Sequence, residues 1–138
     1  MPRPRGRSVP SDAPPRTLGI LLISGSHERA HYAFVVAAGA AALGRDVVLF
    51  ATNAGCKALL TDWSGLTDAA RDARVRETGV AGLAALREAA LELNVRTIAC
   101  EAGLRAEGID PGGLLAETEV AGIATFLSAV AAGQIMTL

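Results

Sequence analysis

The stretch "TLGILLISGSHERAHYAFVVAAGAAALGRDVVLFAT" (17–52) decides the fold of this chain. It begins and ends with apolar runs of strand length, 17–23 and 46–52, which are continuous rather than alternating. Such runs are typical of parallel strands that are covered on both faces. The Ala-rich segment 28–43 between them is patterned like a helix, and Gly44 follows it as a stop signal. A strand, a helix and a strand in this order predict a right-handed crossover in a parallel sheet.

The remainder of the chain continues this alternation. Further strands are predicted at 95–99 and 134–138, and a short one at 119–122. Helices are predicted at 54–60, 80–93 and 121–132, with Asn94 and Gly133 as stop signals, and a helix-like segment follows Cys100. The polar segment 61–79 is expected to be a surface loop or a short exposed helix, in a position that would suit a lid. These elements predict an α/β fold in three layers, α/β/α, with a mostly parallel sheet of about five strands.

Composition and charge exclude several classes of protein. Of the 138 residues 51% are hydrophobic but only 4% aromatic, so we expect one domain whose core is built from small and branched side chains. The formal charge is −1, to which the first sixteen residues contribute +3 through four arginines and Asp12, leaving −4 for the rest. An acidic body offers no basic footprint for nucleic acid.

The opening segment 1–16 is rich in proline and arginine and almost free of apolar residues, which predicts a disordered basic tail ahead of a domain at 17–138. It lacks the apolar stretch that a secretory signal peptide contains. The longest apolar stretches fall short of the roughly 20 residues that span a bilayer. We therefore expect no membrane span and a cytoplasmic location, where both cysteines would stay reduced unless they are redox-active.

Chemistry is expected at the carboxyl ends of the predicted strands, where open parallel sheets bind their ligands. The loops 24–31, 53–57 and 100–108 follow the first three strands, and together they hold both cysteines and both histidines of the chain. This clustering is the strongest chemical signal in the sequence.

Cys100 has two interpretations. At a helix N-terminus, backbone amides favour the thiolate and so a partly exposed, reactive sulfur. Equally, a free cysteine is a small apolar residue that can simply pack at the bend between strand and helix. Cys56, next to Lys57, has a similar position, but it fits a buried helix face better.

The other candidates are weaker. His27 and His31 are four residues apart and would share a helix face, so with Cys56 and Cys100 they could form a Cys₂His₂ metal site. Because no paired cysteine motif is present, we expect no metal site and less than one zinc per chain. The loop Ser24-Gly25-Ser26 could cap the helix that follows and bind an anion through its amides. No glycine-rich nucleotide motif is present.

The sequence also resembles the DsrE/DsrF-like family, which includes sulfur-relay subunits of the DsrEFH and TusBCD type. The similarity is carried by the runs 22–30, 33–60, 99–109 and 120–138, in order and at the usual spacing, and its most specific element is Cys100 followed by a helix and the turn Gly108-Ile109. The segment after Cys100 departs from many relatives, because Glu101, Arg105 and Glu107 make it charged rather than apolar.

The resemblance implies a Rossmann-like domain that carries sulfur as a persulfide on Cys100, without a cofactor, between a donor and an acceptor protein. It implies a homo-oligomer and assigns no role to Cys56. Candidate auxiliary groups that would supply a positive field near the sulfur are Lys57, Arg105 and protonated His27, and Cys56 is a further possible auxiliary residue. The competing hypothesis is a module of the same fold that binds a small ligand or metal, or only assembles with other subunits.

Overall fold

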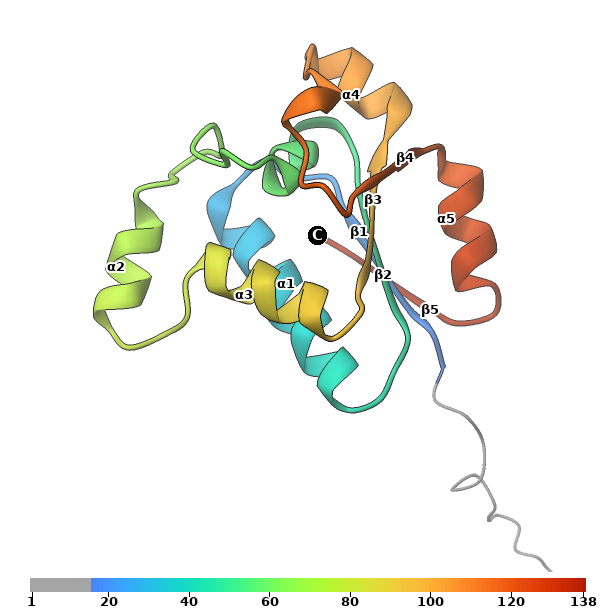
Figure 1. The fold of residues 1–138 in the computed structure, drawn as a ribbon, viewed down its shortest axis with the longest axis horizontal. Coiled ribbons are helices and arrows are strands. Elements are labelled where there is room, and N and C mark those ends of the chain that lie inside the picture. Colours follow the sequence, from blue (N-terminus) through green and yellow to red (C-terminus); the bar gives the residue numbers. More distant parts are fainter. Residues whose placement is uncertain (1–15) are drawn as a thin grey trace, which may run out of the picture.

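The computed structural model describes residues 16–138, so the expected disordered tail lies outside the described residues except for Arg16. The described chain forms one five-stranded sheet in which every neighbouring pair is parallel, in the order β4-β3-β2-β1-β5 (Figure 1). The strands are β1 (Leu18–Leu22), β2 (Val47–Ala51), β3 (Arg96–Cys100), β4 (Glu119–Ala121) and β5 (Gln134–Thr137). The predicted five-stranded parallel sheet is confirmed.

Helices cover both faces of the sheet (Figure 1). One face carries α1 (His27–Ala42) and α3 (Leu83–Glu92), with α2 (Arg71–Glu77) outside them, and the other face carries α5 (Ile123–Val130). The 3₁₀ helix η2 (Asn53–Leu59) and α4 (Glu101–Glu107) follow the carboxyl ends of β2 and β3, and a short 3₁₀ turn, η3 (Pro111–Gly113), follows α4. The three predicted layers are therefore present.

Two apolar clusters hold these layers together. The larger lies between the sheet and α1, α3 and η2, and includes Ile20, Phe34 and Leu49. The smaller lies under α5, where the rings of Phe50 and Phe126 stack with their centroids 5.1 Å apart. Gly19 allows α5 to approach, because a Cβ there would collide with the side chains of Val130 and Phe126.

Element boundaries differ from the prediction where tertiary contacts intervene. The segment predicted as a helix at 54–60 is the 3₁₀ helix 53–59, held against the end of β1 because the Gly55 N–H donates to the carbonyl of Ile23. The helix predicted at 121–132 is shortened to 123–130, because Ala121 pairs with Cys100 in the sheet. The stop signals Gly44 and Asn94 do adopt positive φ, at 90° and 65°.

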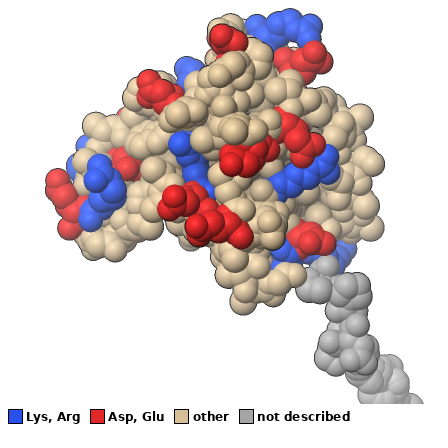
Figure 2. All heavy atoms as spheres, viewed as in Figure 1, with Lys and Arg blue, Asp and Glu red and all other residues tan. Residues whose placement is uncertain are grey.

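The surface shows mixed charge and some apolar exposure. Basic and acidic side chains are interspersed over the face in Figure 2, without a broad basic area there. Within residues 16–138, no helix is both long and apolar enough to cross a membrane. Strand β5 is an edge strand whose residues are all exposed, including Ile135 at 47%.

Candidate functional site

Cys100 is the last residue of β3 and the N-cap of α4. Its sulfur accepts a hydrogen bond from the backbone N–H of Gly103, with 3.4 Å between Sγ and the nitrogen. An N–H directed at the sulfur stabilises the negative charge of a thiolate. The backbone N–H of Gly103 would therefore stabilise Cys100 if its thiol were ionised.

The glycine at position 103 allows α4 to pack closely against η2. A Cβ on Gly103 would collide with the backbone nitrogen of Asn53 and would lie 2.6 Å from Oγ1 of Thr52. Glycine thus lets α4 sit directly on the start of η2. As a result, the loops that follow β2 and β3 meet at the carboxyl edge of the sheet, as the sequence predicted.

The side chain of Cys100 is less accessible than predicted. We expected a partly exposed thiol, but Cys100 is only 8% exposed and packs in the smaller apolar cluster with Phe50 and Phe126, so that expectation was wrong. Side chains alternate along a strand, so Cys100 shares a face with Ile98, and α5 covers that face. A partner protein can reach the sulfur only through the small exposed part of the side chain, or if the residues that pack over Cys100 move.

Cys56 is buried completely in the larger cluster, and its thiol lies 3.4 Å from the carbonyl oxygen of Ala51, to which it donates. Burial raises the pKa of the Cys56 thiol to about 11; the backbone amide of Cys100 acts in the opposite direction, while charges on Cys100 and Glu107 add to the rise. The fold therefore places Cys56 close to Cys100 but keeps it protonated near neutral pH.

The cationic candidates lie on the same elements as the two cysteines. Arg105 stands on α4 and pairs with Glu101 at 3.5 Å, and both side chains are largely exposed. Lys57, in η2, is half-buried and forms no ion pair with another described residue. Within residues 16–138 neither side chain is hydrogen-bonded to the sulfur of Cys100.

His27 is in a different environment from the one predicted. It is fully buried in the first turn of α1, on the sheet face opposite α5, and its Nε2 lies 2.7 Å from Oδ1 of Asp72. His31 stacks on it with 5.6 Å between ring centroids, and Nε2 of His31 contacts the carbonyl of Ala81 at 2.8 Å. Both histidines thus join helices on the face away from the Cys100 side chain.

These positions do not assemble the four-residue metal cluster considered from the sequence. Among residues 16–138, no three His, Cys, Asp or Glu side chains come together in a group that could hold a metal ion. His27 and His31 lie in α1, whereas Cys56 lies in the middle of η2 and Cys100 caps the start of α4.

The loop Ser24-Gly25-Ser26 does cap α1, since Oγ of Ser26 accepts from the N–H of Arg29. Its other polar groups are also engaged: the Ser26 N–H donates to Oγ of Ser24, and Gly25 and His27 pair with the backbone of Thr67. The amides that would have bound an anion are thus largely used within the chain.

Two buried ionic residues were not singled out from the sequence. Asp72 lies in the polar segment 61–79, where no pattern distinguishes it, yet it is 4% exposed. Arg87 is 7% exposed and donates through Nη1 to the carbonyls of Ala58 and Leu60. The spacing of Arg87 from the buried residues Leu83 and Ala90 could have indicated its burial, because the three share one helix face.

Comparison with known proteins agrees with this architecture. The chain is similar to the YchN protein from E. coli, with a TM-score of 0.67 and 15% identity over 89% of this chain and 99% of that one. It is also similar to MTH1491, a protein of unknown function from Methanobacterium thermoautotrophicum, with a TM-score of 0.53, 15% identity and the same coverage. At such identity the similarity shows the fold. No curated protein matches the chain. A model described as the DsrE/DsrF-like family matches residues 18–138, and the chain therefore belongs to the DsrE/DsrF-like family.

Proposed function

We propose that this protein is a sulfur carrier that holds a persulfide on Cys100 and relays it between a donor and an acceptor protein in the cytoplasm. The observation that carries the proposal is the hydrogen bond from the Gly103 N–H to the Cys100 sulfur at the carboxyl end of β3. Membership of the DsrE/DsrF-like family supports it.

The transfer needs no cofactor and no net oxidation. The Cys100 thiolate attacks the outer sulfur of a donor persulfide, a new S–S bond forms on Cys100, and the donor leaves as a thiolate. An acceptor thiolate then attacks the outer sulfur of the Cys100 persulfide, and Cys100 leaves as a thiolate in turn. The Gly103 N–H stabilises the Cys100 thiolate both before loading and after release. Arg105 and Lys57, on the neighbouring elements, are candidates to attract the anionic sulfur of the partner.

Cys56 has no part in this proposal. Its thiol is buried and its pKa is raised to about 11, so only a very small fraction is a thiolate at neutral pH. It fills the space between η2 and the ends of β2 and β3, as a small apolar residue does.

We also propose that the chain forms a homo-oligomer. Ile123 and Leu127 on α5 are 47% and 49% exposed, and Leu43 at the end of α1 is 83% exposed. These apolar side chains, and the exposed edge strand β5, would be covered by contacts between copies.

One observation favours the alternative, a binding or assembly module of the same fold: Cys100 is buried in the smaller apolar cluster. In that case the thiol is a packing residue, and the protein acts through the surfaces that it presents to other subunits or to a small ligand.

Loading with sulfur separates the two functions. We expect incubation with polysulfide, or with a cysteine desulfurase and cysteine, to add the mass of one sulfur atom to the wild type and to Cys56→Ser but not to Cys100→Ser. Intact-protein mass spectrometry under non-reducing conditions measures this. A wild type that takes up no sulfur would support the packing role, and a Cys56→Ser variant that also fails to load would indicate a two-cysteine mechanism.

A further inference from the structure

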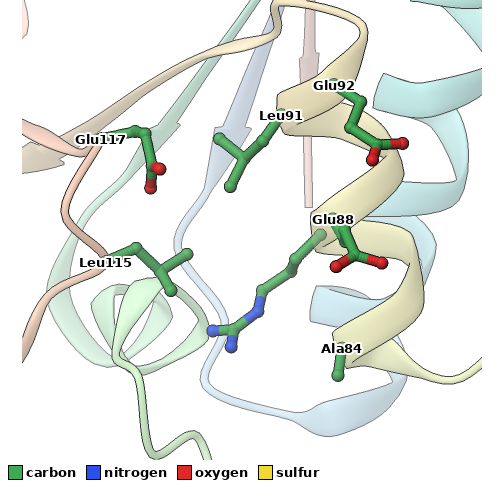
Figure 3. A pocket seen from close by; sticks show the side chains of 7 residues that line it. Ala84, Glu88, Leu91, Glu92, Leu115 and Glu117 are labelled. Carbon is green, nitrogen blue, oxygen red and sulfur yellow. The ribbon is translucent and has the colours of Figure 1, made fainter.

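A hollow of about 450 Å³ lies between α3 and the chain that leads into β4, away from the two cysteines (Figure 3). Leu91 of α3 and Leu115 of the facing chain approach each other across it and are half-buried. The volume is within the range of about 300–1,000 Å³ that is usual for binding sites. The residues that line it are Ala84, Arg87, Glu88, Leu91, Glu92, Leu115 and Glu117.

The rim of this hollow is acidic. Glu88 and Glu92 stand one turn apart on α3, and Glu117 stands on the opposite side (Figure 3). All three are exposed, and none forms an ion pair with another residue between 16 and 138. Figure 2 shows acidic side chains gathered over α3 and over the chain leading into β4, near the middle of this face.

The charge of Arg87, in the wall of the hollow, does not neutralise the rim. Its Nη1 donates to the backbone carbonyls of Ala58 and Leu60, at 3.0 and 2.6 Å, and its Nε is buried without a partner among the described residues. Three carboxylates and one guanidinium leave the hollow net negative. It therefore suits an occupant with several cationic groups, apolar stems to cover the two leucines, and carbonyl oxygens that can accept from a guanidinium. A basic peptide has all three.

We propose that the basic segment of this chain that precedes the described residues, with Arg3, Arg5 and Arg7, occupies this acidic hollow. That segment holds three arginines and three prolines within its first ten residues and no acidic residue there, so its charge complements the rim. This site is separate from Cys100 and goes beyond the sulfur-carrier function.

The chain that joins Arg7 to Arg16 is long enough for the arginines to reach the hollow of the same molecule. Residue 16 lies just before the first residue of β1, and Glu117 lies just before β4. The first residue of β4, Glu119, is level with Leu21 of β1 through the register of the intervening strands. β4 is three strands away from β1, which is about 14 Å across the sheet. Arg7 stands nine residues before Arg16, and this length of chain reaches up to about 30 Å. The arginines therefore stay near the rim at high effective concentration.

The test compares the full chain with two triple variants, one by amide chemical shifts in NMR and the other by the rate of tryptic cleavage. Replacing Arg3, Arg5 and Arg7 by Gln is expected to shift amides of residues 84–92 and 114–118 at low ionic strength. The variant Glu88→Gln/Glu92→Gln/Glu117→Gln is expected to expose the segment, so that trypsin cleaves after Arg5 and Arg7 about threefold faster than in wild type. High salt should abolish the difference, because the ion pairs are exposed.

A matched control removes the same charge elsewhere. Glu28→Gln/Glu77→Gln/Glu107→Gln, at exposed positions outside the hollow, should leave both the tryptic rate and the shifts at 84–92 unchanged. If the amide chemical shifts of the arginine variant changed only at residues 1–16, the proposal would be overturned. The occupant of the hollow would then be a basic segment of another protein. Shifts that grow with protein concentration would overturn binding within one molecule in favour of binding between copies.

Discussion

Asp72 joins three helices, because Oδ1 of its carboxylate lies 2.7 Å from Nε2 of His27 and also accepts from the N–H of Leu83 at 2.8 Å. Oδ2 accepts from Nε of Arg76 at 3.1 Å. His27 begins α1 and Leu83 begins α3, so one carboxylate fixes α2 to the helices that cover the sheet. The segment that the sequence placed as a surface loop or lid is thus anchored by a buried charge.

Asp72 should make the stability of the fold depend on pH. Burial opposes its ionisation, but hydrogen bonds from Leu83, His27 and Arg76 outweigh burial and hold the pKa of Asp72 below its ordinary value. Because the folded pKa is lower than the unfolded one, the stabilisation is complete above about pH 4 and is lost as pH falls through the folded pKa. We expect Asp72→Asn to lower the free energy of unfolding by about 2 kcal/mol at pH 7, and by much less at pH 2. Urea unfolding at both pH values measures this.

Asp68→Asn is the matched control for that experiment. Asp68 pairs with Arg74 at 3.3 Å, but both side chains are more than half exposed, so the pair should contribute at most about 0.5 kcal/mol. Equal losses of stability at pH 7 in the two variants would contradict the anchoring role of Asp72.

The two cysteines should differ in reactivity with iodoacetamide. At pH 8 a thiol with a pKa of about 11 is ionised on the order of one part in a thousand, and Cys56 is also fully buried. Cys100 is 8% exposed and has an N–H donor at its sulfur, so we expect it to react at least about tenfold faster than Cys56. Peptide mapping by mass spectrometry gives both rates. In urea the two rates should converge, and a native protein that labels Cys56 first would refute this assignment.

Adding one methyl group should have opposite effects at two helical glycines. Gly103→Ala places a Cβ against the backbone of Asn53, which cannot move aside easily, and we expect a loss of about 2–3 kcal/mol and altered labelling of Cys100. Gly39→Ala, in α1, places its new Cβ more than 4 Å from every atom outside the neighbouring residues and the backbone of its own helix, and should stabilise the fold by up to about 1 kcal/mol. Thermal unfolding measures both. A Gly103→Ala variant as stable as the wild type would mean that α4 is not packed as described.

Assembly should be visible in the mass of the protein in solution. We expect light scattering at micromolar concentration to give a dimer to a hexamer. Leu127→Lys on α5 and Leu43→Lys at the end of α1 are alternative probes, since both side chains are exposed in the single chain and tolerate a charge there. The variant that becomes monomeric identifies the face that is covered. A monomeric wild type would exclude the homo-oligomer.

The pattern of the sequence was sufficient to predict the three layers and the succession of strands and helices along the chain. Continuous apolar runs such as 46–52 report burial on both faces, and the Ala-rich segment 28–43 reports a helix, because both signals are local and repeat along the chain. Cys100 was also placed correctly at the end of its strand, since a strand followed directly by a helix fixes that position.

The environments of individual side chains were decided by the tertiary structure. The Cys100 thiol is buried in the smaller apolar cluster, to which α5 contributes Phe126 and Val130 from more than twenty residues further along the chain. From the sequence, His27 was expected to be a solvated residue at the start of a helix. In the structure it pairs with Asp72 of α2, which lies 45 residues further along the chain, and no local pattern predicts this pairing. Local periodicity determines which residues form strands and helices, but accessibility and ion pairing depend on contacts between segments that are far apart in the sequence.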